Sequence, residues 1–148
     1  SAVKNNIEKF EGLVLFYDAS TRHRKKLNEI CKVMFPKNKL TFVDYVDPLH
    51  VGETLNDINY VITAKLHVGI VSLSLGKKVL SIAHHGKTKR LYKQLGLEQW
   101  CIGPRDFSVT NVDGKLKNMF KNEYREIDRQ LLRKNYEILL NKIRRAML

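Results

Sequence analysis

Short apolar runs alternate with amphipathic segments along most of the 148-residue chain, and this alternation predicts an α/β fold. The strand candidates are apolar throughout rather than at every second residue, which indicates a parallel sheet covered on both faces. The composition, 43% hydrophobic and 28% charged, is typical of a folded globular chain. We therefore expect residues 1–148 to form one three-layer, Rossmann-like domain. Its mostly parallel sheet should have about five or six strands, followed by a helical C-terminal tail.

The first half of the chain contains three predicted strands, at 12–17, 40–46 and 60–63. Between the first two, apolar residues recur at three- and four-residue steps from Arg22 to about Phe35, which predicts an amphipathic helix that Pro36 ends. We expect Asp47-Pro48 to close the second strand and residues 54–59 to form a short helix or turn.

The second half continues the alternation. A helix is predicted from about Ala64 to Leu75, with Thr63 as its N-cap and Gly76 after its end. The segments that follow are a strand at 79–83, a loop at 84–88, a helix at 89–95, a strand at 100–102, a turn at 112–114 and one or two helices from Phe120 onward.

Cationic or imidazole side chains follow four of the five predicted strands. They are Arg22, His23 and Arg24 after the first strand, Lys65 and His67 after the third, His84, His85 and Lys87 after the fourth, and Arg105 after the fifth. The carboxyl ends of parallel strands share one edge of a sheet, where helix N-termini offer free N–H groups and a partial positive charge. The sequence therefore predicts an anion-binding site at that edge.

The chain has 27 Lys and Arg against 15 Asp and Glu, a net charge of +12 that indicates an anionic partner. Half of this excess lies beyond residue 114, where ten Lys and Arg stand against four Asp and Glu. A basic amphipathic C-terminal helix could lie on an anionic membrane or pack against the rest of the protein, and both alternatives stay open. No nucleic-acid-reading motif is present, so we expect no nucleic-acid partner.

Several classes of chemistry lack their motifs. The sequence has no G-x-G-x-x-G after the first strand, no phosphate-binding P-loop and no G-x-S-x-G elbow. Its two cysteines, Cys31 and Cys101, have no metal-ligand spacing, so we expect free thiols and no metal or cofactor. No apolar run reaches the length of a membrane-spanning helix, and we expect a cytoplasmic protein, with peripheral contact at the inner face of the membrane as one alternative.

Residues 57–97 resemble the C-terminal half of the polysaccharide pyruvyl transferase family. The matching features are the strand Tyr60-Val61-Ile62, the helix start Lys65-Leu66-His67, the step Gly76-Lys77-Lys78, Lys87 in the next loop, and Leu95-Gly96-Leu97 at a helix end. Lys65 stands where the family usually has Arg, and Lys78 stands where it usually has Pro.

The resemblance implies the C-terminal, donor-binding half of a two-domain, glycosyltransferase-B-like enzyme. Such enzymes transfer the enolpyruvyl group of phosphoenolpyruvate to a sugar of a bacterial cell-surface polysaccharide, which forms a pyruvate ketal. The resemblance implies catalytic roles for His67 and Lys65, and donor binding by Lys65, Lys87, His85 and Arg22. An N-terminal domain outside this chain would hold the sugar or lipid-linked saccharide acceptor, so we expect the isolated half to have little or no activity.

Two other functions remain as alternatives. A glycosyltransferase-B-type domain could bind a nucleotide sugar at the same edge, although no Glu or Asp begins the helices after the third and fourth strands. A non-catalytic basic module could instead bind an anionic surface.

Overall fold

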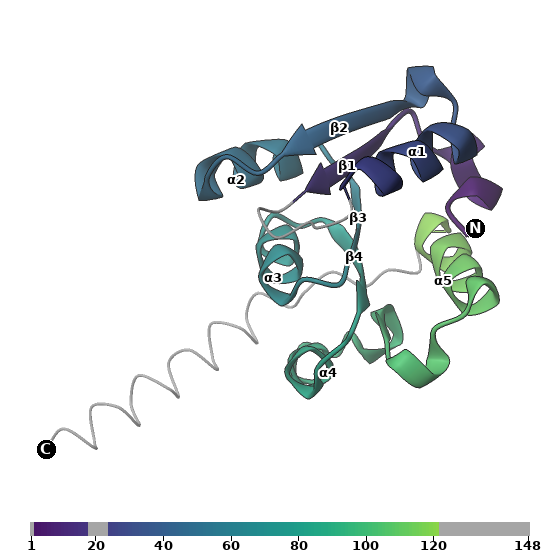
Figure 1. Cartoon of the computed structure of the whole chain (residues 1–148). Helices are drawn as coiled ribbons and strands as arrows, with labels where there is room; N and C mark the ends of the chain where they lie inside the picture. Colours follow the sequence, from purple (N-terminus) through teal and green to yellow (C-terminus); the bar gives the residue numbers. More distant parts are fainter. Residues whose placement is uncertain (1, 18–23, 122–148) are drawn as a thin grey trace, which may run out of the picture.

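The computed structural model describes residues 2–17 and 24–121, which form a mixed α/β fold with short parallel strands (Figure 1). The strands are β1 (Leu13–Tyr17), β2 (Leu40–Asp44), β3 (Tyr60–Thr63), β4 (Lys78–Ile82) and β5 (Cys101–Ile102). The α-helices are α1 (Arg24–Met34), α2 (Pro48–Asn56), α3 (Leu66–Ser74), α4 (Gly86–Gln94) and α5 (Val109–Phe120). Short 3₁₀ helices are η1 (Lys4–Lys9), η2 (Lys37–Lys39), η3 (Glu98–Trp100) and η4 (Pro104–Asp106).

The strands lie in two parallel sheets. β1 pairs with β2, with Leu13 opposite Leu40, and the larger sheet has the order β3-β4-β5. Within residues 2–17 and 24–121, no strand ladder joins the two sheets. The α/β class and the parallel pairing are thus confirmed, whereas the continuous sheet of five or six strands that we expected is not formed by the described strands.

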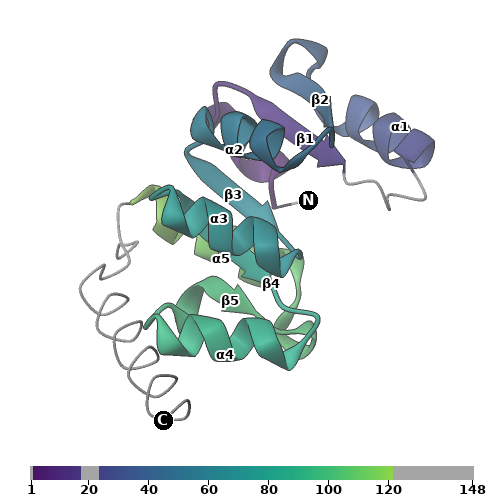
Figure 2. The same cartoon turned by 90° about the vertical axis from the view of Figure 1, so that its left-hand side faces the viewer.

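Strand β4 is the centre of the larger sheet and of the apolar core. Val79 and Leu80 are completely buried, because α3 and α4 lie on one side of this sheet and α5 on the other (Figures 1 and 2). The core around β4 comprises Ala2, Leu55, Val61, Leu73, Val79, Leu80, Tyr92, Leu97, Trp100, Ile102, Val112, Leu116 and Met119. A strand buried on both faces explains the uninterrupted apolar pattern of this segment.

Two helices begin earlier than the sequence predicted. α2 starts at Pro48, because the Asp47 side chain accepts a hydrogen bond from the His50 N–H at 2.8 Å and Pro48 occupies the first helical position. Asp47-Pro48 therefore opens a helix as well as following a strand. α4 starts at Gly86, three residues before the predicted boundary, so Lys87 lies in a helix rather than in a loop.

The turn predicted at residues 112–114 is wrong, because this segment lies inside α5. Ser108 caps the helix by accepting a hydrogen bond from the Asn111 N–H at 3.1 Å, and Leu116 and Met119 are buried on its inner face. Packing of this face offsets the low helix propensity of Asp-Gly. The helices predicted beyond Phe120 lie outside the described residues, apart from Lys121.

Three aromatic rings join the segment before β1 to the larger sheet. Phe10, Tyr60 and Phe120 pack edge to face, with ring centroids 5.1 to 6.2 Å apart. Lys78 lies beside them, with its Nζ 5.6 Å from the centre of the Tyr60 ring and 3.2 Å from the carbonyl oxygen of Met119, to which it donates. Lys78 thus has a packing role at the position where the resembled family usually has proline.

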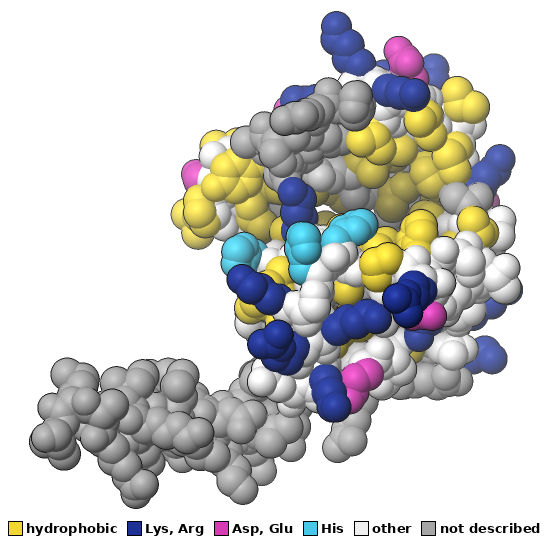
Figure 3. Space-filling view, turned by 60° about the horizontal axis from the view of Figure 1, so that its bottom comes forward, with side chains coloured by type: hydrophobic (Ala, Val, Ile, Leu, Met, Phe, Trp, Pro, Cys, Tyr) yellow, Lys and Arg dark blue, Asp and Glu magenta, His cyan; other side chains and the backbone are white. Residues whose placement is uncertain are grey.

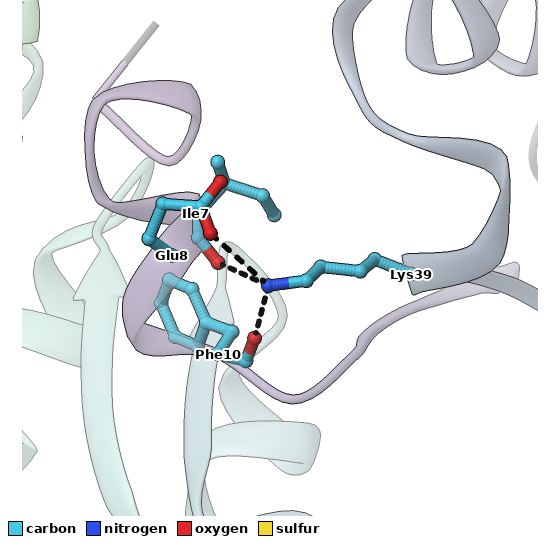
Figure 4. Close-up of polar contacts among 4 residues, drawn as sticks. All are labelled: Ile7, Glu8, Phe10 and Lys39. Atoms are coloured by element: carbon cyan, nitrogen blue, oxygen red, sulfur yellow. Dashed lines mark hydrogen bonds and ion pairs between the residues drawn. The ribbon is translucent and has the colours of Figure 1, made fainter.

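Lys39 makes a second connection to the N-terminal segment (Figure 4). Its ammonium donates to the carbonyl oxygens of Phe10 at 3.0 Å and Ile7 at 3.4 Å, and lies 3.7 Å from the Glu8 carboxylate. These carbonyls end η1, where a positive charge is favourable. Lys39 therefore holds η1 against the start of β2.

Replacing Lys39 with Met should destabilise the protein by about 1–2 kcal/mol, because the carbonyl groups at the end of η1 lose a charged donor while the apolar stem is kept. Urea unfolding of both forms measures the difference. Lys37→Met is the matched control, since Lys37 is exposed and the hydrogen bonds to these carbonyls come from Lys39. An equal loss of stability in the two variants would contradict this role of Lys39.

The buried Asn6 side chain connects η1 to α5. Its Nδ2 donates to Asp113 Oδ1 at 2.7 Å and to the Ala2 carbonyl oxygen at 2.9 Å. Asp113 also contacts the Lys117 ammonium at 2.8 Å. The hydrogen bond from Lys117, with a smaller contribution from Asn6, holds the pKa of Asp113 below its ordinary value.

Because the pKa of Asp113 is lower in the folded than in the unfolded chain, its ionised form stabilises the fold above about pH 4, and this stabilisation disappears as the pH falls through the folded-state pKa. Asp113→Asn removes the charge and keeps an oxygen that can accept from Asn6. We expect the variant to have the lower Tm at neutral pH and the difference to narrow below about pH 4. Thermal unfolding followed by circular dichroism measures both.

The control repeats this substitution in a Lys117→Met background, where the neutral-pH difference should be much smaller. A difference in Tm that is unchanged by pH, or by loss of Lys117, would show that the charge of Asp113 is not what stabilises this contact.

Candidate functional site

The carboxyl ends of β3, β4 and β5 lie at one edge of the larger sheet, because the three strands are parallel. α3 begins two residues after β3, and α4 begins three residues after β4. Neither of these fully described helices has an acidic residue in its first turn. Two helix N-termini without an acidic residue in their first turns therefore lie at this edge, and such N-termini suit an anion.

Lys65 and His67 are placed there by a turn that Thr63 stabilises. The Thr63 hydroxyl accepts from the Lys65 N–H at 3.0 Å and lies 3.4 Å from the Lys65 carbonyl oxygen. Lys65, not Thr63 as predicted, is the N-cap of α3, and His67 is the second residue of the helix. Both side chains are exposed, so they are accessible at the helix start.

His84, His85 and Lys87 occupy the corresponding position after β4. His85 is the N-cap of α4, and Lys87 is the second residue of that helix. All three side chains are exposed. Lys87 and His67 thus hold equivalent positions in the first turns of consecutive helices.

The two groups are brought together because β3 and β4 are neighbours in the sheet, with Thr63 opposite Ser81. Adjacent strands lie about 4.8 Å apart, so residues that follow them are within reach of one ligand. Figure 3 shows histidine side chains close together on one face, beside lysine and arginine side chains. Arg22, the remaining predicted ligand, lies outside the described residues.

Lys89 is a further cation at this edge that sequence reasoning missed. Its side chain lies against buried Gly103, directly after β5, where an added Cβ would come within 2.6 Å of Lys89 Cε. The Asp106 carboxylate oxygen would lie 3.4 Å from a Cβ added at Gly103. Gly103 was the signal in the sequence that could have indicated this contact, since a glycine at the end of a strand often lets another group approach the backbone closely.

Other charged side chains differ in their surroundings. Arg24, at the start of α1, forms an ion pair with Asp44 at the end of β2, which offsets its charge. Arg105 is exposed in η4. A shallow hollow of about 330 Å³ is lined by Lys32, Lys37, Leu40 and Phe42, and includes none of the predicted site residues.

The described residues give no support for metal or thiol chemistry at this edge. Among residues 2–17 and 24–121, no three His, Cys, Asp or Glu side chains are grouped so that they could hold a metal ion. Cys31 and Cys101 are free, as predicted. Burial raises the pKa of both thiols, although Lys89 and Lys115 partly oppose this at Cys101.

No helix in the described part of the chain is both long enough and apolar enough to cross a membrane.

Comparisons of the chain with protein-family models, with curated proteins and with solved structures found no match. The resemblance to pyruvyl transferases therefore stays a prediction drawn from the residues.

Replacing Thr63 with Val should lower the free energy of unfolding by about 1 kcal/mol, because the Lys65 N–H loses its acceptor in a half-buried turn. Thr63→Ser is the matched control, since it keeps the hydroxyl and should be the less destabilised variant. Denaturant unfolding measures both. If Ser cost as much stability as Val, the methyl group and not the hydroxyl would hold this turn.

Proposed function

We propose that this chain is the donor-binding half of a pyruvyl transferase that uses phosphoenolpyruvate. The observation that carries the proposal is the meeting of two acid-free helix N-termini, one bearing Lys65 and His67 and the other bearing His85 and Lys87. Phosphoenolpyruvate carries a phosphate and a carboxylate on three carbons, so it needs cations from two directions. Two adjacent helix starts supply them.

In this proposal Lys65 and Lys87 hold the phosphate and the carboxylate, assisted by the backbone N–H groups of α3 and α4. His85 is a further ligand, and so is Arg22. The ammonium of Lys65 binds as a point charge, without the two-pronged geometry of the arginine usual in the resembled family. His67 serves as the general acid and base, because histidine can donate and accept a proton near neutral pH.

The proposed transfer begins with protonation of the donor and ends with loss of phosphate. A proton from His67 adds to the methylene carbon of the donor, and positive charge develops on the central carbon. One sugar hydroxyl attacks that carbon and loses its proton to a base. A second hydroxyl then displaces phosphate and gives its proton to the departing group, which leaves a cyclic pyruvate ketal and hydrogen phosphate. The cations lower the barrier by stabilising the departing phosphate.

The proposal extends to the architecture and location. β1-β2 and β3-β4-β5 would belong to one Rossmann-like sheet, which the shared parallel pairing of both sheets supports. A second, N-terminal domain would bind the sugar or lipid-linked saccharide acceptor. The enzyme would act in the cytoplasm, where phosphoenolpyruvate is available, and no further cofactor is required by the chemistry.

Calorimetric titration with phosphoenolpyruvate tests the site. Lys87→Met should weaken binding by about tenfold or more, because a charged contact to the phosphate or carboxylate is lost. Lys93→Met is the matched control in the last turn of the same helix and should leave the affinity unchanged. His67→Gln should also bind the donor with nearly wild-type affinity, since its proposed role is proton transfer.

Equal weakening by Lys87→Met and Lys93→Met would contradict a specific site. Tight binding of a nucleoside diphosphate sugar, without binding of phosphoenolpyruvate, would instead favour the glycosyltransferase alternative.

We further expect the 148-residue chain alone to release no phosphate from phosphoenolpyruvate in the presence of sugar acceptors, because it lacks the proposed acceptor domain. A colorimetric phosphate assay measures this. Turnover by the chain alone would contradict the proposed division of donor and acceptor binding between two domains.

A further inference from the structure

Helix α4 has an unusually basic surface. Its nine residues, GKTKRLYKQ, include four cations and no acid. The cations are Lys87, Lys89, Arg90 and Lys93, and all four residues are exposed. The proposed donor site uses only the first turn of this helix, so the basic surface of its later turns has no role in that site.

The cations of the later turns point away from the protein core. Thr88 and Tyr92 are buried and mark the inner face of α4. At about 100° per residue, Arg90 and Lys93 lie roughly 140° to 200° around the helix from Thr88. These two side chains therefore form the crest of the solvent face, while Lys89 reaches sideways to Gly103.

Exposed apolar side chains lie in the segment that follows Gly103, where the Lys89 side chain packs. Phe107 and Val109 follow η4 in the chain, and each is 56% exposed. Phe107 is next to Asp106, whose carboxylate lies beside Gly103, where the Lys89 side chain also lies. The segment that begins at Gly103, against which Lys89 of this basic row lies, thus goes on to an exposed aromatic ring and a valine. Figure 3 shows lysine and arginine side chains gathered on this side of the molecule.

We propose that the outer face of α4, with Phe107 at its margin, docks on an anionic lipid bilayer. A bilayer surface offers a layer of negative headgroups above an apolar interior, which matches cations bordered by an exposed aromatic side chain. Nucleic acid fits less well, because the row has a single exposed ring and no series of rings on which bases could stack.

Helix α1 provides a contrast on the same protein. It also has lysines, Lys25, Lys26 and Lys32, but Glu29 lies among them and Arg24 is paired with Asp44. Its solvent face therefore has a lower density of uncompensated positive charge than that of α4. The docking inference does not depend on the proposed transfer reaction, since it uses neither Lys87 nor the histidines.

Co-sedimentation with vesicles tests the inference, using phosphatidylcholine alone and phosphatidylcholine mixed with phosphatidylglycerol. The full chain should bind only the anionic vesicles, and added salt should weaken this binding. The double variant Arg90→Glu, Lys93→Glu should reduce the partition coefficient by about tenfold or more. Phe107→Ser should also reduce the partition coefficient. The size of this reduction should be the same at low and high salt, because the lost contact is apolar.

Lys25→Glu, Lys26→Glu is the matched control, with the same change in net charge on exposed α1 positions. Retained vesicle binding in this control, together with loss in the α4 variant, supports the inference. Equal loss in both variants, retained binding in the α4 variant, or no binding by the wild type would overturn it. Binding of duplex DNA through Arg90 and Lys93, without vesicle binding, would overturn it in favour of a nucleic-acid surface.

Discussion

The burial of β4 on both faces is the constraint on which most of the fold depends. Val79 and Leu80 are fully enclosed, and β4 has a parallel neighbour on each side. Parallel neighbours require crossover connections, which here contain α3 and α4, so both helices must begin at the same edge of the sheet. The convergence of Lys65, His67 and Lys87 is thus a consequence of how the core is built. A candidate site appears where the packing requirement brings helix N-termini together.

Part of the large positive charge has a structural role. Lys39 binds carbonyl oxygens at the end of η1, Lys77 donates to the Asn56 carbonyl at the end of α2 at 2.6 Å, and Lys78 donates to the Met119 carbonyl near the end of α5. A cation at such a position interacts favourably with the negative end of the helix. The net charge therefore has two parts. Some lysines donate to the last carbonyl groups of helices, and other cations are exposed at the sheet edge and along α4.

The sequence was sufficient for the elements whose signals are local. β3 has the predicted bounds, and β1 begins one residue inside its predicted segment. The error at α2 arose because Asp47-Pro48 is a turn signal and a helix start at once, and the error within α5 arose because burial of Leu116 and Met119 outweighs the local tendency of Asp-Gly to turn. The placement of Lys65, His67 and Lys87 after neighbouring strands followed from the parallel topology, although Lys87 lies in α4 and not in the predicted loop. Lys89 could not be found in this way, since its approach to Gly103 depends on how α4 packs beside β5.

Cys101 gives the larger sheet an internal reporter. It lies in β5, an edge strand of two residues, and its thiol is free and half-buried. Because this thiol is half-buried, it reacts more slowly in the closed sheet than when the strand separates from β4, so the rate of modification rises with the frequency of opening. The shortest of the described strands thereby makes the local opening of its sheet measurable by chemical kinetics, through a thiol already present in the sequence.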